Sequence, residues 1–169
     1  MAFPAYLSVK GNRQCQFKGE AVEQDRKDKW MVVLSFAMDL EAPRDPHTRL
    51  PVGKREWKPL KIVKEWGAAS PQALTACATN EGLSEVTIEF TKTNTTGQEY
   101  VYQRVTLANA TIAEIDRFTG YPGAPDNGPK HTSWADTLEL ERWSFTFQKI
   151  EVVDLDANTT FNDDWLATP

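Results

Sequence analysis

The sequence predicts a mainly β fold: a β-barrel or sandwich of two sheets with one short α-helix and an extended protruding loop. Apolar residues alternate with polar ones at period two in several stretches, which is the pattern of strands. Only residues 70–80 show the spacing of a helix. Residues 41–55 and 119–135 are dense in proline and glycine, which interrupt regular structure and predict two long loops.

The first quarter of the chain is expected to hold two main strands. Residues 5–10 alternate and form the first, with a short extended piece at residues 16–20 after a turn. Residues 21–29 are highly charged and predict a solvated loop. Residues 30–40 predict one long strand. One of its faces is wholly apolar and consists of Trp30, Val32, Leu34, Phe36, Met38 and Leu40. The residues of the other face are small or apolar, so the strand is expected to be covered on both sides.

The proline-rich loop at residues 41–55 is too polar to belong to the core. It carries three prolines and four arginine or lysine residues, and proline removes the backbone donors that a sheet needs. Long loops inside compact domains are uncommon and tend to be functional or disordered. On these residues alone, a surface insert and a binding arm are equally open.

Two strands flank a helix at the centre of the sequence. Residues 60–65 and 86–90 alternate at period two, and the first of these strands places Lys64 on the same face as Leu60 and Ile62. This strand–helix–strand unit is the most regular part of the chain.

The helix between these strands is bounded by residues that favour helix ends. Ser70 is predicted as the N-cap and Pro71 as the first helical residue. Asn80 and Gly82 supply the stop. The face predicted to pack on a sheet consists of Leu74, Cys77 and Ala78.

The second half of the chain predicts two more long strands and a tail. A turn at residues 93–97 leads into a strand that begins near Glu99 and bends or bulges near residues 109–111. The last strand contains Trp143, Phe145 and Phe147 on one face, after an apparent phase shift that predicts a bulge at Glu141 and Arg142. Residues 157–169 predict a polar C-terminal tail whose one docking side chain would be Trp165.

Composition limits the class of protein. A length of 169 residues without an interdomain linker predicts one domain, residues 1–169. The net charge of −5 argues against nucleic-acid binding, and no stretch is long and apolar enough for membrane insertion. The first ten residues lack the basic start and apolar stretch of a signal peptide. Two cysteines are too few for a disulfide framework and suit a reducing cytosol.

The sequence predicts no catalytic, cofactor or metal site, and therefore no enzyme. His47 and His131 lie in separate loops without a second ligand at zinc spacing. Cys77 is expected to be a small core residue, and Cys15 to be exposed. The acidic residues near the C-terminus, Asp154, Asp156, Asp163 and Asp164, lack the pattern of a calcium loop.

Three stretches resemble the Hcp (TssD) family, the inner-tube protein of bacterial type VI secretion systems. They read KPLKIVKEWGAASPQAL, TNEGLSEVTIEF and LERWSFTFQKIE. The resemblance extends from AYLSVKG near the start to SFTFQKIE near the end and so covers most of the chain.

The resemblance implies a structural role in secretion. It implies a homohexameric ring, rings stacked head to tail into a tube, and a contractile sheath that propels the tube with a spike and effector proteins. It also implies residence in the bacterial cytoplasm before assembly and export through the type VI apparatus without a signal peptide. In such subunits the loop at residues 41–55 contacts the next ring, which selects as stacking residues Arg44, Arg49, Leu50, Val52, Lys54 and Arg55.

Two other functions stay open on the sequence. A tail-tube subunit of a phage-like or extracellular contractile injection system would share the same physical features. Six tryptophans also suit a sugar-binding β-sandwich module, since flat aromatic faces stack on sugars. Trp30 and Trp143 are expected in the core, whereas Trp57, Trp66, Trp134 and Trp165 lie at strand ends or in loops, where a subunit interface would use them equally well.

Overall fold

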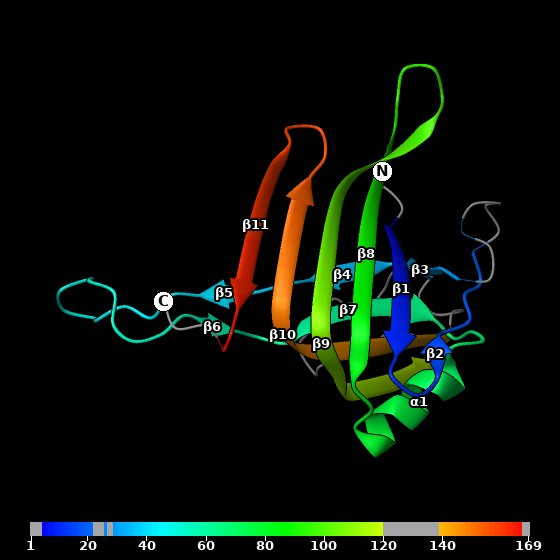
Figure 1. Ribbon diagram of the computed structural model, residues 1–169, viewed down its shortest axis with the longest axis horizontal. Coiled ribbons are helices and arrows are strands. Elements are labelled where there is room, and N and C mark those ends of the chain that lie inside the picture. Colours follow the sequence, from blue (N-terminus) through cyan, green and yellow to red (C-terminus); the bar gives the residue numbers. More distant parts are fainter. Residues whose placement is uncertain (1–4, 22–25, 27–28, 120–138, 167–169) are drawn as a thin grey trace.

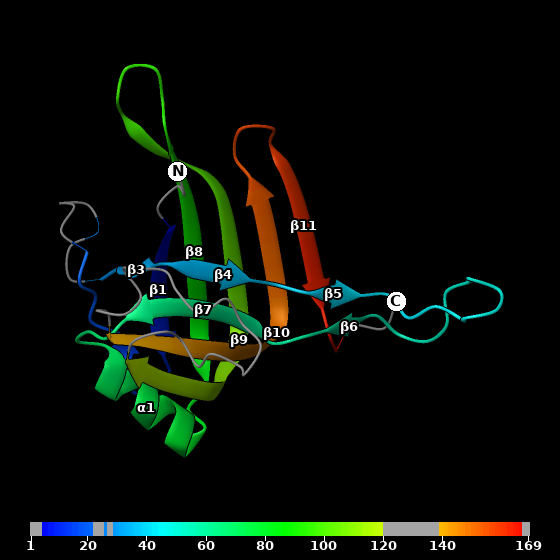
Figure 2. The same cartoon turned by 180° about the vertical axis from the view of Figure 1, so that it is seen from behind.

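A computed structural model describes residues 5–21, 26, 29–119 and 139–166 (Figures 1 and 2). The described part of the chain is mainly β with one helix, as predicted. In chain order the elements are β1 (Ala5–Gly11), β2 (Cys15–Gln16), β3 (Met31–Val33), β4 (Ser35–Ala37), β5 (Leu40–Glu41), β6 (Glu56–Trp57), β7 (Leu60–Glu65), α1 (Ser70–Thr79), β8 (Leu83–Thr93), β9 (Glu99–Thr119), β10 (Glu139–Asp154) and β11 (Thr159–Asp164). The predicted loop at residues 119–135, with His131 and Trp134, lies almost wholly outside the described residues.

Antiparallel pairing joins nine of the strands into one sheet that folds over on itself. Its order is β2-β1-β8-β9-β10-β7-β4, with β3 beside β1 and β11 beside β10, while β5 and β6 form a separate two-stranded sheet. The long strands β9 and β10 bend, so that one half of each runs beside β8 and β11 and the other half crosses below, beside β7 (Figure 1). The result is a barrel-like pair of layers.

The core lies between these two layers. Its fully buried side chains come from strands of both, including Leu7 of β1, Ile62 of β7, Ile88 of β8, Leu107 of β9 and Phe145 of β10. Because each strand alternates between the core and the outer face, the period-two pattern in the sequence locates these residues correctly. Trp143 is fully buried, as expected, whereas Trp30 is only half-buried.

The bend in β9 falls where the sequence predicts it. Asn109 has a φ of +50°, a conformation that asparagine tolerates better than most residues.

The bulge predicted in the last strand, β10, lies at a different place from the one predicted. The β9–β10 register shifts between Ser144 and Phe145, whereas the pairing of β10 with β7 runs without a break through Glu141 and Arg142. The bulge predicted at those two residues is therefore absent.

Helix α1 has the predicted extent but a different buried face. Ser70, Ala73 and Ala76 are buried, and Leu74 is 40% exposed. Cys77 packs partly against the core, as expected, but Ala78 is exposed. Small side chains on the inner face let the helix lie close against β9. A cost of about 2–5 kcal/mol for Leu74→Ala, which full burial would predict, does not apply.

Ser70 does not act as the N-cap of α1. Ala69 occupies that position, and Ser70 is the first helical residue. The Ser70 hydroxyl accepts a hydrogen bond from the Gly67 N–H at 3.0 Å and donates one to Glu141 at 2.8 Å, which ties the start of the helix to β10. Asn80 ends the helix in the left-handed conformation, as predicted.

The single strand predicted at residues 30–40 is three short strands. Met31 and Val33 are buried in β3, while Val32 and Leu34 are exposed, so the prediction of a strand covered on both sides is wrong there. At Leu34 the chain leaves the edge of β1 and joins β7 as β4, with the Leu34 N–H donating to the Val63 carbonyl at 2.8 Å. This change of layer reverses which residues face inward.

The predicted C-terminal tail contains a strand. β11 pairs with β10 over six residue pairs, from Lys149 with Asp164 to Asp154 with Thr159. Trp165 follows and packs partly against the core, with its N–H donating to the Gln148 carbonyl at 2.9 Å. No helix among the described residues is long and apolar enough to cross a bilayer.

Candidate functional site

Residues 42–55, between β5 and β6, form an arm that projects beyond β11 and away from both layers (Figures 1 and 2). Its two sides are joined like a hairpin. The Asp45 N–H donates to the Leu50 carbonyl, the Val52 N–H donates to the Pro43 carbonyl, both at 2.9 Å, and Arg44 bridges Pro51. These backbone hydrogen bonds give the arm a defined conformation, unlike that of a flexible surface insert.

The end of the arm is a tight turn organised by Asp45. The Asp45 carboxylate accepts the backbone N–H groups of His47 at 2.7 Å and Thr48 at 2.9 Å. These two hydrogen bonds hold the pKa of Asp45 below its usual value. Leu50 is 63% exposed and Val52 is 45% exposed, so both apolar side chains of the arm present a large part of their surface to solvent.

The arm is fixed at its root by the C-terminal strand. Arg55 forms a two-pronged ion pair with Asp163 of β11 and also donates to the Asp164 carbonyl at 3.0 Å. Trp57 donates its indole N–H to the same Asp163 carboxylate at 2.7 Å. Lys54 donates to the Trp165 carbonyl. These contacts with β11 and the residues after it therefore fix the orientation of the arm relative to the sheet.

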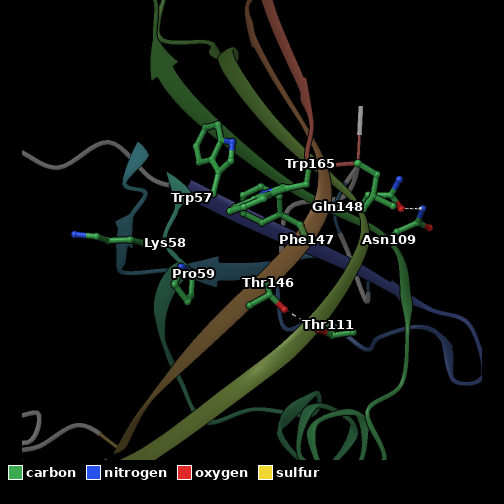
Figure 3. A pocket seen from close by; sticks show the side chains of 10 residues that line it. Trp57, Lys58, Pro59, Asn109, Thr111, Thr146, Phe147, Gln148 and Trp165 are labelled. Carbon is green, nitrogen blue, oxygen red and sulfur yellow. Dashed lines mark hydrogen bonds between the residues drawn. The ribbon is translucent and has the colours of Figure 1, made fainter. Parts of the chain in front are cut away.

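A groove of about 460 Å³ lies beside this root (Figure 3). Its apolar part comes from Trp57, Phe147 and Trp165, with Trp57 edge-on to Phe147 at a ring separation of 5.6 Å. Its polar side chains pair with one another: Thr111 with Thr146 at 2.8 Å, and Asn109 with Gln148 at 2.9 Å. The ten lining residues are Trp57, Lys58, Pro59, Asn109, Thr111, Thr146, Phe147, Gln148, Trp165 and Leu166.

β11 also leaves an open strand edge. It pairs with β10 alone among the described strands, so the backbone groups along its other side have no strand partner there. Such edges are ready to pair with another chain unless something covers them. The arm and this edge lie on the same side of the subunit (Figure 1), and the groove is lined there by Trp57 of β6 and by Trp165, which follows β11.

The residues selected from the sequence as a stacking loop divide into two groups. Arg44, Arg49, Leu50 and Val52 lie on the projecting part of the arm. Lys54 and Arg55 lie at the root and hold it to the C-terminal segment, which the sequence did not indicate. Sequence reasoning also missed the role of Asp163, whose partner Arg55 is 108 residues away in the chain.

Asp163→Asn is expected to loosen the arm root and to destabilise the subunit by about 1.5–3 kcal/mol, the usual contribution of hydrogen bonds to a charged group. Arg55 and then Trp57 hold the pKa of Asp163 below its usual value of 3.8, against the effect of burial. A lowered pKa means that the stabilisation is complete above that usual value and is lost as pH falls through the folded-state pKa. Urea unfolding should therefore separate parent and variant at pH 7 but not at strongly acidic pH. Equal stability at pH 7 would show that the ion pair does not hold the root.

The fold and these surfaces define a mainly β protein with a projecting arm, an apolar groove and an open strand edge. Among the described residues, no three His, Cys, Asp or Glu side chains gather to hold a metal ion. Residues 6–153 match the sequence model of a family described as "Type VI secretion system effector, Hcp". This match covers more than half of the chain.

Comparison with known proteins points to the same family. The chain is 30% identical over 173 residues to the "Major exported protein" of Pseudomonas aeruginosa, covering 98% of this chain and 96% of that protein. A solved variant of Hcp1 from the E. coli EAEC 042 pathovar is 26% identical with a TM-score of 0.82, covering 97% of this chain and 99% of the other. The secreted protein Hcp3 from Pseudomonas aeruginosa is 25% identical with a TM-score of 0.74, covering 98% and 100%.

The chain therefore belongs to the Hcp family of type VI secretion systems. It is a subunit of the type VI secretion tube, as the resemblance in its sequence implies. Membership places it among the structural, secreted components of that system.

Proposed function

We propose that six copies of this chain form a closed ring and that rings stack head to tail into a tube. The observation that carries this proposal is the arm, which is internally ordered, fixed at its root and uncovered at its apolar end. An arm of this kind loses little conformational entropy when it docks, because its shape already exists before contact. The stacking residues would be Arg44, Arg49, Leu50, Val52, Lys54 and Arg55, with the last two acting through the root.

The tube works by mechanical transport and without catalysis. A contractile sheath propels it, together with a spike, and effector proteins travel with it out of the cell. Before assembly the subunit resides in the bacterial cytoplasm. Its partners are copies of itself, the sheath, the spike and the effectors.

The other two candidate functions have less support. The family match favours a type VI apparatus over other contractile particles, whose tube subunits would share the same physical features. A sugar-binding module needs flat, open aromatic faces, but Trp57 is only 7% exposed and is packed against Phe147.

Electron micrographs of the purified protein test the ring. We expect round particles with six-fold symmetry and a central hole, formed without other proteins, because the contacts repeat identically around the ring. Fields that contain only small particles without a hole, at concentrations well above micromolar, would contradict the proposal.

A further inference from the structure

The outward face of α1 is unusual for a helix on a protein surface. Residues 70–80 contain no Asp, Glu, Lys or Arg. The exposed residues of the helix are Pro71, Leu74, Thr75, Ala78 and Thr79. Surface helices normally turn charged and polar residues to water, and depletion of charge together with apolar content is typical of the core of a protein interface.

The groove beside the arm root has the same character. Lys58 is the one charged residue among its ten lining residues. Its polar side chains already have partners in one another, so an apolar occupant would leave none of the paired groups Thr111, Thr146, Asn109 and Gln148 without a hydrogen bond. Its volume of about 460 Å³ is enough for several small or medium side chains.

The outward face of α1 and the end of the groove formed by Trp57 and Trp165 belong to different ends of the subunit, since Trp57 lies in β6 and Trp165 follows β11. In Figure 1, α1 lies below β1 and β2, whereas β6, the arm and the C-terminal end of β11 lie at the far side of the sheet. A ring needs such an arrangement, because each subunit must present one patch to the neighbour on its left and a different patch to the neighbour on its right.

The electrostatics of the two surfaces are complementary. The C-terminal end of a helix carries partial negative charge, and the last turn of α1 contains no basic residue to offset it. The groove supplies a cation at its margin, since the Lys58 side chain is 54% exposed and has only a weak partner in Glu41 at 3.8 Å.

We propose that the outward face of α1 in one subunit seats in the groove between Trp57, Phe147 and Trp165 of the next subunit in the same ring. Leu74 enters the groove, and Lys58 of the neighbour approaches the C-terminal carbonyl groups of the helix. This contact rests on the proposed ring and specifies which surfaces close it.

Disulfide cross-linking tests the contact directly. In a chain with Cys15→Ser and Cys77→Ala, the pair Ala78→Cys and Thr146→Cys should give, on mild oxidation, a ladder of cross-linked species that ends at six. The control pair Ala78→Cys and Leu155→Cys should give none, because Leu155 lies in the β10–β11 turn, away from the groove. Rings without cross-links in the first pair would overturn this contact and leave the ring itself standing. A parent chain that forms no ring would overturn both.

A substitution without cysteines gives a second test. Leu74→Arg should weaken association between subunits at least tenfold at each contact, while the melting curve of the subunit changes little because this side chain is already partly exposed. Leu155→Arg, at a leucine of similar exposure, should leave rings unchanged. A Leu74→Arg chain that still forms rings at the concentration where the parent does would overturn the proposal.

Discussion

Replacing Lys64 by methionine is expected to lower the free energy of unfolding of the subunit by about 3–5 kcal/mol, the usual cost of removing one partner from a buried ion pair. Lys64 and Glu141 are both fully buried, with Lys64 Nζ 3.5 Å from Glu141 Oε1 and 3.4 Å from Glu20 Oε1. Arg117 lies 3.2 Å from the second oxygen of Glu141, and Ser70 of α1 donates to the first. Loss of the lysine removes the fully buried cation beside Glu141 Oε1 and leaves Arg117, at Oε2, as the remaining cation next to this buried carboxylate.

The pH dependence of this variant provides an internal check. Burial raises the pKa of Glu20, and Lys64 offsets part of that rise. Without Lys64 the pKa should rise further, and protonation of the carboxyl group then favours the folded state. The deficit in stability should therefore shrink as pH falls below neutrality. The double variant Lys64→Met with Glu141→Gln should recover part of the loss, because it removes the buried charge. If urea unfolding at pH 7 shows that Lys64→Met lowers the free energy of unfolding by less than 1 kcal/mol, water reaches the charged groups around Lys64.

Replacing residues 44–54 with a short Gly/Ser turn is expected to leave rings intact but to abolish tubes and secretion. The replaced segment carries the exposed Leu50 and Val52 and a surplus of basic residues, whereas the chain as a whole has a net charge of −5. Such an arm suits an acidic face of the adjacent ring. Six copies act together around each ring, so modest energies per subunit add up to strong stacking. Retaining Arg55 keeps the ion pair with Asp163 in the variant.

Electron microscopy of this variant beside the parent, under conditions where the parent stacks, decides among three roles for the arm. Rings without tubes are the expected result. Long tubes in the variant would make the arm a passive insert, and loss of rings as well would assign it to the interface within a ring. Leu50→Ser with Val52→Ser is the matched control that keeps the arm backbone, and it should weaken stacking without altering rings.

The helix, the strand at residues 60–65 and the hairpin at residues 93–97 could be predicted because local signals determine them. Alternation places Leu60, Ile62 and Lys64 on one face, and that face is buried as a whole. Gly97 has a φ of +83° in the hairpin turn, which glycine adopts without strain. Where local preference and tertiary packing agree, the sequence pattern alone is sufficient to predict the element and its buried face.

The errors arise where tertiary contacts decide. Glu141 is polar in the sequence but belongs to the same inward face as Trp143 and Phe145, because Lys64 lies opposite it on β7. Counting this glutamate as outward-facing created the false phase shift. At Leu34 the chain changes layers, and the inward face changes with it, which no property of residues 30–40 reveals.

The arm could be predicted, but its root could not. Three prolines and a run of basic residues indicate a projecting segment. The pairing of Arg55 with Asp163 joins positions 108 residues apart. Phe161 is the one apolar residue of β11, so the strand has no alternating apolar face that would identify it. The groove beside the root depends on the same long-range arrangement.

The molar mass of the purified protein in solution tests the central claim most directly. Six chains of 19.1 kDa amount to about 115 kDa, and light scattering coupled to size exclusion at micromolar concentration should report that mass. The value should persist on dilution, because the release of one subunit from a closed ring breaks two contacts at once. A stable species near 19.1 kDa at that concentration would contradict the ring, and with it the tube that depends on it.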